Sequence, residues 1–306
     1  MSALRARGFL QQSIEFALFA RSHAYNFRVN RLEAFGYIAA QATRGEISLP
    51  TSVNSVLRLK MALDNPDCPT DDAIRLVLGE PQLAARTVAL SNSAAFNSGG
   101  GGPAITNVRA AINRIGYRNL QTLVASLLVR QFGAHISDLS LRAKAEQLWQ
   151  HTAHVAALAQ VFARRVTGIN PDTAVFAAIV HEVGGFYLLS RAGEFPGLLD
   201  ADPENWATLC EEVVSRAVLR KLAVPEEVAD AIGGLRAGMM GMPPTSLVDT
   251  LMLANQYAPV PSPLDNRSVP RDAESMTDLV FDDGMLAAIQ VEAEEAYRAM
   301  SAALMV

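Results

Sequence analysis

The stretch NPDTAVFAAIVHEVGG, residues 170–185, decides how the fold is interpreted. Its opening Asn-Pro-Asp has the order of a helix N-cap followed by a first turn. Residues 174–180 are all apolar, so the predicted helix has no polar face for water and must be buried. We expect this helix to end at Gly184 and Gly185, because glycine commonly follows a last turn. The core is therefore predicted to be built around a helix.

Helical periodicity continues on both sides of this stretch. A segment that carries His151 and His154 predicts a long helix over 145–165. Further helices are predicted over 10–20, 29–42, 53–63, 206–222, 225–235 and 246–257. A last helix has an apolar stripe between Leu286 and Leu304, which we expect to pack on the chain's own core, with docking on a partner as the alternative. Strand-like alternation is missing, so the predicted fold class is all-α.

Short helices separated by turns are predicted in the part of the chain before residue 136. Glu80 precedes Pro81, which suits a first helical turn. Asn92 and Ser93 follow an apolar helix, and capping that helix or bridging to the next one explains them with fewer assumptions than ligand binding. The four glycines at 99–102 have no preceding strand and no following Lys-Ser or Lys-Thr, so they indicate a flexible loop and not a phosphate cradle.

Composition limits the kinds of partner. Half of the 306 residues are apolar and 19% are charged, which is ample for a core. The net charge of −5 gives no global field that attracts nucleic acid or anionic membrane, so no DNA, RNA or membrane partner is expected. About 18 consecutive apolar residues without a charge, the length of a membrane span, are not found. Two cysteines without metal-ligand spacing fit a reduced compartment, and we expect a cytoplasmic protein.

Four segments across residues 47–257 resemble the HDOD family of bacterial signalling proteins, in the family's order. They are Leu49-Pro50 with the helix over 53–63; Glu80-Pro81-Gln82-Leu83 with Ser91-Asn92-Ser93-Ala94; Ala111-Ile112 to Ile115-Gly116; and Trp149-x-His151 with residues 177–184. Glu80 stands where the family usually has aspartate, and either carboxylate can precede the helix that Pro81 opens. We expect the motif residues Glu80, Pro81, Asn92, Ser93 and Gly116 to be structural.

The resemblance implies a fold and a division of the chain. The implied fold is the HD-domain, phosphodiesterase-like helical architecture with an additional N-terminal helical subdomain. We expect an N-terminal helical extension over 1–45 and the HDOD domain over 46–257. Within it, 46–135 form the N-terminal helical subdomain and 136–257 the HD-like subdomain. Residues 258–306 are expected to be a Pro-rich linker and an amphipathic C-terminal helix.

The resemblance also implies where a metal site stands in active relatives, the HD phosphohydrolases. Their first histidine matches His151, their His-Asp pair matches His181-Glu182, and their later aspartate matches Asn255. Glutamate at 182 moves the carboxylate out by one methylene, and asparagine at 255 removes a negative charge. Extra histidines of the branch that hydrolyses cyclic dinucleotides are replaced by Glu211 and by Leu235-Arg236. The resemblance therefore indicates a degenerate site without a resident metal or other cofactor.

Two interpretations of the remaining histidines stay open. His151 and His181 are expected to be core histidines that hydrogen-bond to Glu182 or to main chain, since buried polar groups nearly always have such partners. The alternative is a metal site on His151, His181 and Glu182. A possible ligand pocket includes His154, Glu211 and Arg236, because guanidinium suits phosphate oxygens.

The expected function is a non-catalytic regulatory or scaffold module of bacterial signal transduction, so no enzymatic activity is expected. Its partner is expected to be another signalling protein, and a nucleotide ligand fits the pocket chemistry. The alternative function is a metal-dependent phosphohydrolase or cyclic-dinucleotide phosphodiesterase with a reduced ligand set.

Overall fold

This computed structural model describes residues 31–49, 51–93, 104–134, 136–199, 204–235, 240–265 and 283–304, and the regular secondary structure in these ranges is helical. The elements are α2 (Arg31–Thr43), α3 (Thr51–Leu63), α4 (Thr70–Leu78), α5 (Pro81–Ser91), α6 (Val108–Gln131), α7 (Leu139–Phe162), η1 (Ala163–Thr167), α8 (Pro171–Val180), α9 (Val183–Ala192), α10 (Glu204–Leu209), α11 (Glu211–Lys221), α12 (Glu226–Gly234), α13 (Leu247–Gln256) and α15 (Asp283–Leu304). No strand occurs in these ranges, so the all-α prediction is confirmed. The predicted helix over 10–20, the glycine loop and Arg236 lie outside the described residues.

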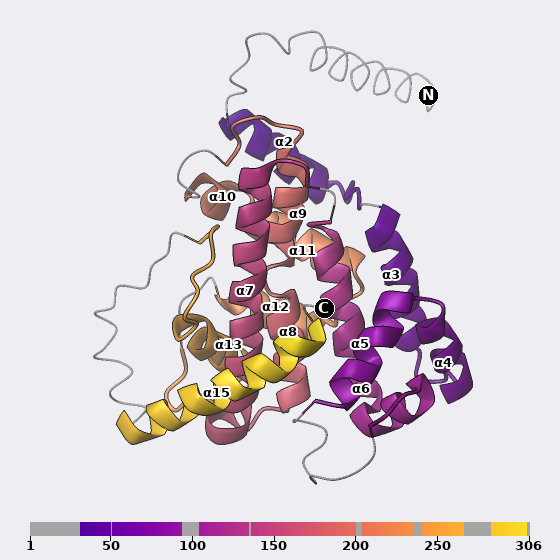
Figure 1. Ribbon diagram of the computed structural model, residues 1–306. Coiled ribbons are helices and arrows are strands. Elements are labelled where there is room, and N and C mark those ends of the chain that lie inside the picture. Colours follow the sequence, from indigo (N-terminus) through magenta and orange to yellow (C-terminus); the bar gives the residue numbers. More distant parts are fainter. Residues whose placement is uncertain are drawn as a thin grey trace.

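Helix α7 lies in the centre of the molecule, between the other helices (Figure 1). It begins where the Asp138 side chain accepts a hydrogen bond from the Leu141 amide at 2.9 Å, which caps its first turn. It packs against α8, α9, α13 and α15, so most of its surface faces other helices. A single π-helical turn, η1, follows it and ends at Gly168. Side chains on α7 are therefore held by neighbours on several sides.

The stretch that decides the fold forms two buried helices and not one. Asn170 accepts hydrogen bonds from the amides of Asp172 and Thr173, which confirms the predicted N-cap of α8. Helix α8 ends at Val180, earlier than predicted, and the two glycines lie in the first turn of α9. The correction has a physical reason, because these glycines serve helix packing and not helix termination. Residues Pro171–Ala192 are long and apolar enough to cross a membrane, yet 78% of their most apolar window is buried inside the protein.

Helices α9 and α11 approach closely at Gly184. A Cβ atom added there would lie 2.1 Å from Ser215 Oγ and 3.0 Å from both Ser215 Cα and Cβ. Only a residue without a side chain fits this contact. The predicted single helix over 206–222 is interrupted at Cys210, between α10 and α11. Helix α2 docks beside this break, where the Cys210 thiol lies 3.0 Å from the Phe35 carbonyl oxygen.

Helices α3 to α6 lie on one side of the molecule in Figure 1. They contact the other helices mainly where α6 packs against α8. Helix α6 bends at Gly116, whose φ of 78° and ψ of 165° interrupt the helical backbone. This conformation is nearly restricted to glycine. The bend divides α6 into two helical pieces.

Helix α15 lies across α7 and α5 in Figure 1. Ile289 and Ala293 of its apolar stripe are buried against them. On its polar side, Glu292 accepts a hydrogen bond from Arg165 Nε at 2.6 Å. The described part of the last helix thus packs on the chain's own core, as the stripe predicted.

Candidate functional site

Two adjacent core helices bring together the histidines and the glutamate singled out by the sequence. His151 lies on α7, His181 is the C-cap of α8, and Glu182 follows it as the N-cap of α9. One donor atom from each of the three lies within 4.8 Å of the others. The two imidazole rings are 5.5 Å apart between centroids. Because α7 and α8 pack along each other, these side chains converge in the core. We call these three residues the donor triad.

Main-chain carbonyl groups fix both imidazoles. Nδ1 of His151 lies 2.7 Å from the Val260 carbonyl oxygen, and Nδ1 of His181 lies 2.6 Å from the Ala178 carbonyl oxygen. A carbonyl oxygen can only accept, so each Nδ1 carries a proton and Nε2 is the nitrogen whose lone pair a metal ion would use. Nε2 of His151 is buried and has no hydrogen-bond partner among the described residues. Metal-ligating histidines commonly show this arrangement, in which Nδ1 donates to main chain and Nε2 ligates.

The donor triad fits one transition-metal ion better than two. Two neutral imidazoles and one carboxylate form the His₂Glu set that holds zinc in catalytic sites with an open fourth position. A two-ion centre needs bridging carboxylates, and Glu182 is the only carboxylate in the triad. Bound there, an ion would supply Lewis acidity to a phosphoryl oxygen or a water.

The other predicted site residues are spread over several places. Asn255 is half-buried in the last turn of α13, a helix that contacts both α7 and α8. Glu211 opens α11 and does not join the donor triad. His154 stacks on Tyr297 of α15 with ring centroids 3.8 Å apart and planes at 8°. Burial lowers the pKa of His154, against the opposing effect of Glu294. His154 therefore lies in the interface between α7 and α15.

The family-motif residues cluster around the ends of α5 and the bend of α6. Glu80 is the N-cap of α5, and Pro81 is in its first turn, as predicted. The Asn92 side chain accepts a hydrogen bond from the Ile105 amide at 2.8 Å and donates one to the Ile105 carbonyl at 2.7 Å. Ser93 Oγ donates to the Leu90 carbonyl at 2.8 Å. These contacts close the loop between α5 and α6, and Gly116 makes the bend in α6.

A buried carboxylate organises the loop before α13. Asp249 accepts hydrogen bonds from the amides of Gly241, Thr245 and Ser246 and from the Ser246 hydroxyl. Burial alone would raise the pKa of Asp249, but these hydrogen bonds hold it below the ordinary value. The loop over residues 241–246 is thus fixed by a structural carboxylate.

Replacing Asp249 by asparagine is expected to lower the free energy of unfolding by about 1–3 kcal/mol at neutral pH, because donors are left unsatisfied. Since the folded-state pKa is depressed, the contribution is present above the unfolded pKa of about 4 and is lost as pH falls through the folded value. Urea unfolding at several pH values measures this. The difference between wild type and variant should shrink below about pH 4, and a difference independent of pH would contradict the assignment.

Sequence reasoning missed a second polar cavity, of about 350 Å³, lined by residues of α5, α6, α7 and α9. Three arginines line it: Arg86, Arg130 and Arg142. Only some of the residues that line this cavity could have been grouped from the sequence. Arg142, Glu146 and Trp149 repeat at helical spacing on α7, while the other arginines come from distant segments.

A helical core with two histidines and a glutamate converging between α7 and α8 defines the HD-like class of helical proteins. The chain belongs to the HDOD family, because the HDOD domain model matches residues 49–229. No curated protein matches the chain.

Solved structures show the same fold. A protein from Shewanella amazonensis, provisionally named a metal-dependent phosphohydrolase, is 18% identical with a TM-score of 0.66, covering 90% of this chain and 99% of its own. An HDOD domain protein of unknown function from Geobacter sulfurreducens is 21% identical with a TM-score of 0.58, covering 88% and 98%. A protein from Marinobacter aquaeolei, provisionally named for signal transduction, is 16% identical with a TM-score of 0.58, covering 92% and 68%. At these identities the likeness concerns the fold alone.

Proposed function

We propose that the protein is a non-catalytic regulatory module of bacterial signal transduction that acts by binding another signalling protein. The observation that carries the proposal is the donor set: within the described residues, His151, His181 and Glu182 form the one group of three or more potential ligands. The position that matches the later aspartate of active HD phosphohydrolases is Asn255, which is neutral. The set thus has one donor and one negative charge fewer than the four-ligand set of active HD phosphohydrolases, and no second carboxylate to bridge a second ion.

The HDOD family membership and the name of the Marinobacter relative support a role in signalling. In this role the donor triad is a core polar cluster. Carbonyl hydrogen bonds to both Nδ1 atoms hold the imidazoles in one orientation. The fold is then a rigid scaffold, and its surface contacts the partner.

The second candidate function is metal-dependent phosphoester hydrolysis. One observation favours it, because the buried Nε2 of His151 lacks a hydrogen-bond partner among the described residues. A metal ion is one ligand that would satisfy this atom. His151, His181 and Glu182 would hold the ion, and an open position would accept water or substrate.

Metal content and turnover separate the two functions. We expect the purified protein, loaded with zinc or manganese and dialysed, to retain less than about one ion per five chains, since affinity depends strictly on ligand count. We expect its hydrolysis of bis-nitrophenyl phosphate and of a cyclic dinucleotide to equal that of His181→Ala. Stoichiometric metal, together with turnover that His181→Ala removes, would overturn the proposal.

A restored donor set is the positive control. The double variant Glu182→Asp with Asn255→Asp recreates the set implied by active relatives, and it should bind metal about tenfold more tightly or better than wild type. His154→Asn is the matched negative control, because His154 stacks on Tyr297 and is not in the donor triad. Comparison of these variants by metal titration shows whether ligand loss explains the inactivity.

A further inference from the structure

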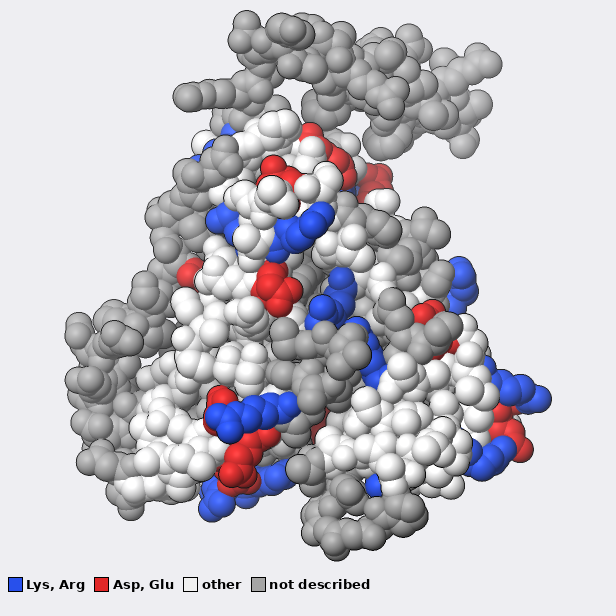
Figure 2. Space-filling model, viewed as in Figure 1, with Lys and Arg blue, Asp and Glu red and all other residues white. Residues whose placement is uncertain are grey.

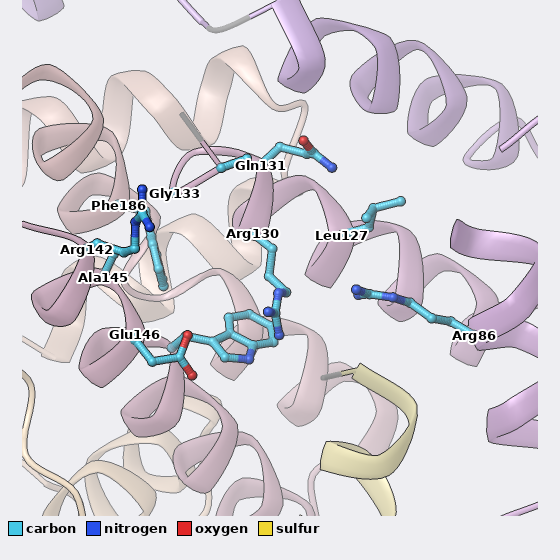
Figure 3. A pocket seen from close by; sticks show the side chains of 11 residues that line it. Arg86, Leu127, Arg130, Gln131, Gly133, Arg142, Ala145, Glu146 and Phe186 are labelled. Atoms are coloured by element: carbon cyan, nitrogen blue, oxygen red, sulfur yellow. The ribbon is translucent and has the colours of Figure 1, made fainter. Parts of the chain in front are cut away.

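The arginine-lined cavity lies away from the donor triad and has its own chemistry. Arg86 comes from α5, Arg130 from α6 and Arg142 from α7, against one lining carboxylate, Glu146. Figure 3 shows Arg86 extending toward Arg130, with Arg142 on the other side of Arg130. In Figure 2, basic side chains gather in a hollow near the middle of the drawn face. The lining thus has an excess of positive charge.

The arginines of this cavity lie close enough to affect each other's charge. Arg86 is 7% exposed, so its guanidinium is largely removed from water. Burial lowers the pKa of Arg86, and the charge of Arg130 lowers it further. Two like charges facing one cavity are stabilised when an anion lies between them. Charged groups with a shifted pKa at a cavity are typical of a binding site.

A second observation points to a ligand. The indole of Trp149 is 2% exposed and lines the cavity, and its Nε1 has no hydrogen-bond partner among the described residues. Indole Nε1 is a donor only, so an acceptor such as a phosphoryl oxygen satisfies it. Arg130 lies over the Trp149 ring at 5.1 Å, and Phe186 contacts the same ring edge to face at 6.4 Å. The indole is therefore fixed beside the arginines.

We propose that this cavity binds a phosphate-bearing small molecule, with Arg86, Arg130 and Trp149 Nε1 as donors to the phosphoryl oxygens. Arginine is the preferred side chain for such oxygens because its planar fork donates two parallel hydrogen bonds. The volume of about 350 Å³ is that of a small-molecule site. Arg142 lies at the rim, where its guanidinium donates to the Ile136 carbonyl at 3.0 Å and 3.2 Å. The inference goes beyond the proposed function, because it holds whether or not the donor triad is catalytic.

Fluorescence tests the site directly, because the chain has two tryptophans. In a Trp206→Phe background, Trp149 is the sole indole reporter. Pyrophosphate and AMP are titrated at constant ionic strength, with chloride as the reference anion. We expect saturable changes in Trp149 emission with at least one phosphate compound, and a rise in melting temperature of the unmodified chain. No change with either probe up to about 10 mM, well above typical ligand affinities, would overturn the proposal.

Variants locate the binding. Arg86→Gln and Arg130→Gln should each weaken binding about tenfold or more, since each removes a charged donor. Arg118→Gln is the matched control, because Arg118 is exposed on the same helix as Arg130 and does not line the cavity. Equal loss in Arg118→Gln and Arg130→Gln would show general charge screening and reject the site. Circular dichroism checks the fold of each variant, and Arg130→Lys, which keeps the charge without the fork, should restore only part of the affinity.

Discussion

Replacing Gly184 by alanine is expected to lower the free energy of unfolding by about 3 kcal/mol, the upper part of the range for overpacked cores. The added Cβ would fall 2.1 Å from Ser215 Oγ and 3.0 Å from Ser215 Cα and Cβ. Two of these atoms belong to the backbone and the base of a side chain, so rotation of Ser215 cannot relieve the clash. Helices α9 and α11 must separate. Urea unfolding measured by circular dichroism gives the loss.

Gly193 provides the control on the same helix. Its backbone is helical, with φ of −64°, and a Cβ there meets nothing within 4 Å. Gly193→Ala should therefore change stability by less than about 1 kcal/mol, in the stabilising direction. A double-mutant cycle with Ser215→Ala removes the nearest contact, so Gly184→Ala should cost less in that background. An equal cost in both backgrounds would show that Ser215 is not the obstacle.

Replacing Gly116 by alanine is expected to cost about 1–3 kcal/mol for a different reason. A Cβ at Gly116 meets nothing within 4 Å, so space is available. The cost arises from the backbone, whose φ of 78° and ψ of 165° lie in a region that side chains strongly disfavour. Thermal and urea unfolding of the variant measure it.

Gly36 is the control for Gly116, since it lies inside α2 with open space around it and no left-handed φ. Gly36→Ala should stabilise the protein by about 0.5–1 kcal/mol, because glycine is a poor helix former. The two variants should thus change the free energy of unfolding in opposite directions. If both alanine variants were stabilising, α6 would be straight in solution and the bend at Gly116 would be rejected.

Local capping signals gave the most dependable part of the predicted fold. The Asn-Pro-Asp start of α8 and the place of Pro81 in α5 follow from donors and acceptors within one turn, which the sequence contains in full. The glycine pair was misinterpreted because glycine marks both helix ends and close helix packing. Which one applies depends on Ser215, a residue of another helix. That contact depends on tertiary packing, which the local sequence does not specify.

The members of the donor triad could be located from the sequence through the resemblance to the HDOD family and its HD relatives, and the structure places them within 4.8 Å of each other. Its chemistry could not be predicted as fully. The partner of His151 Nδ1 is the Val260 carbonyl, a main-chain atom in a proline-rich segment without any motif. The arginine-lined cavity was not predicted, because Arg86, Arg130 and Trp149 come from three helices whose packing decides their meeting.

The position of α15 has a consequence for synthesis on the ribosome. This helix contacts α5 and α7, which lie far before it in the sequence, just as α2 contacts the distant α11. Contacts between such distant segments slow folding, because long loops must close first. Nascent chains must therefore expose apolar faces of α5 and α7 until α15 emerges. Translation pauses between the synthesis of α7 and that of α15 should lower yield more than pauses after α15.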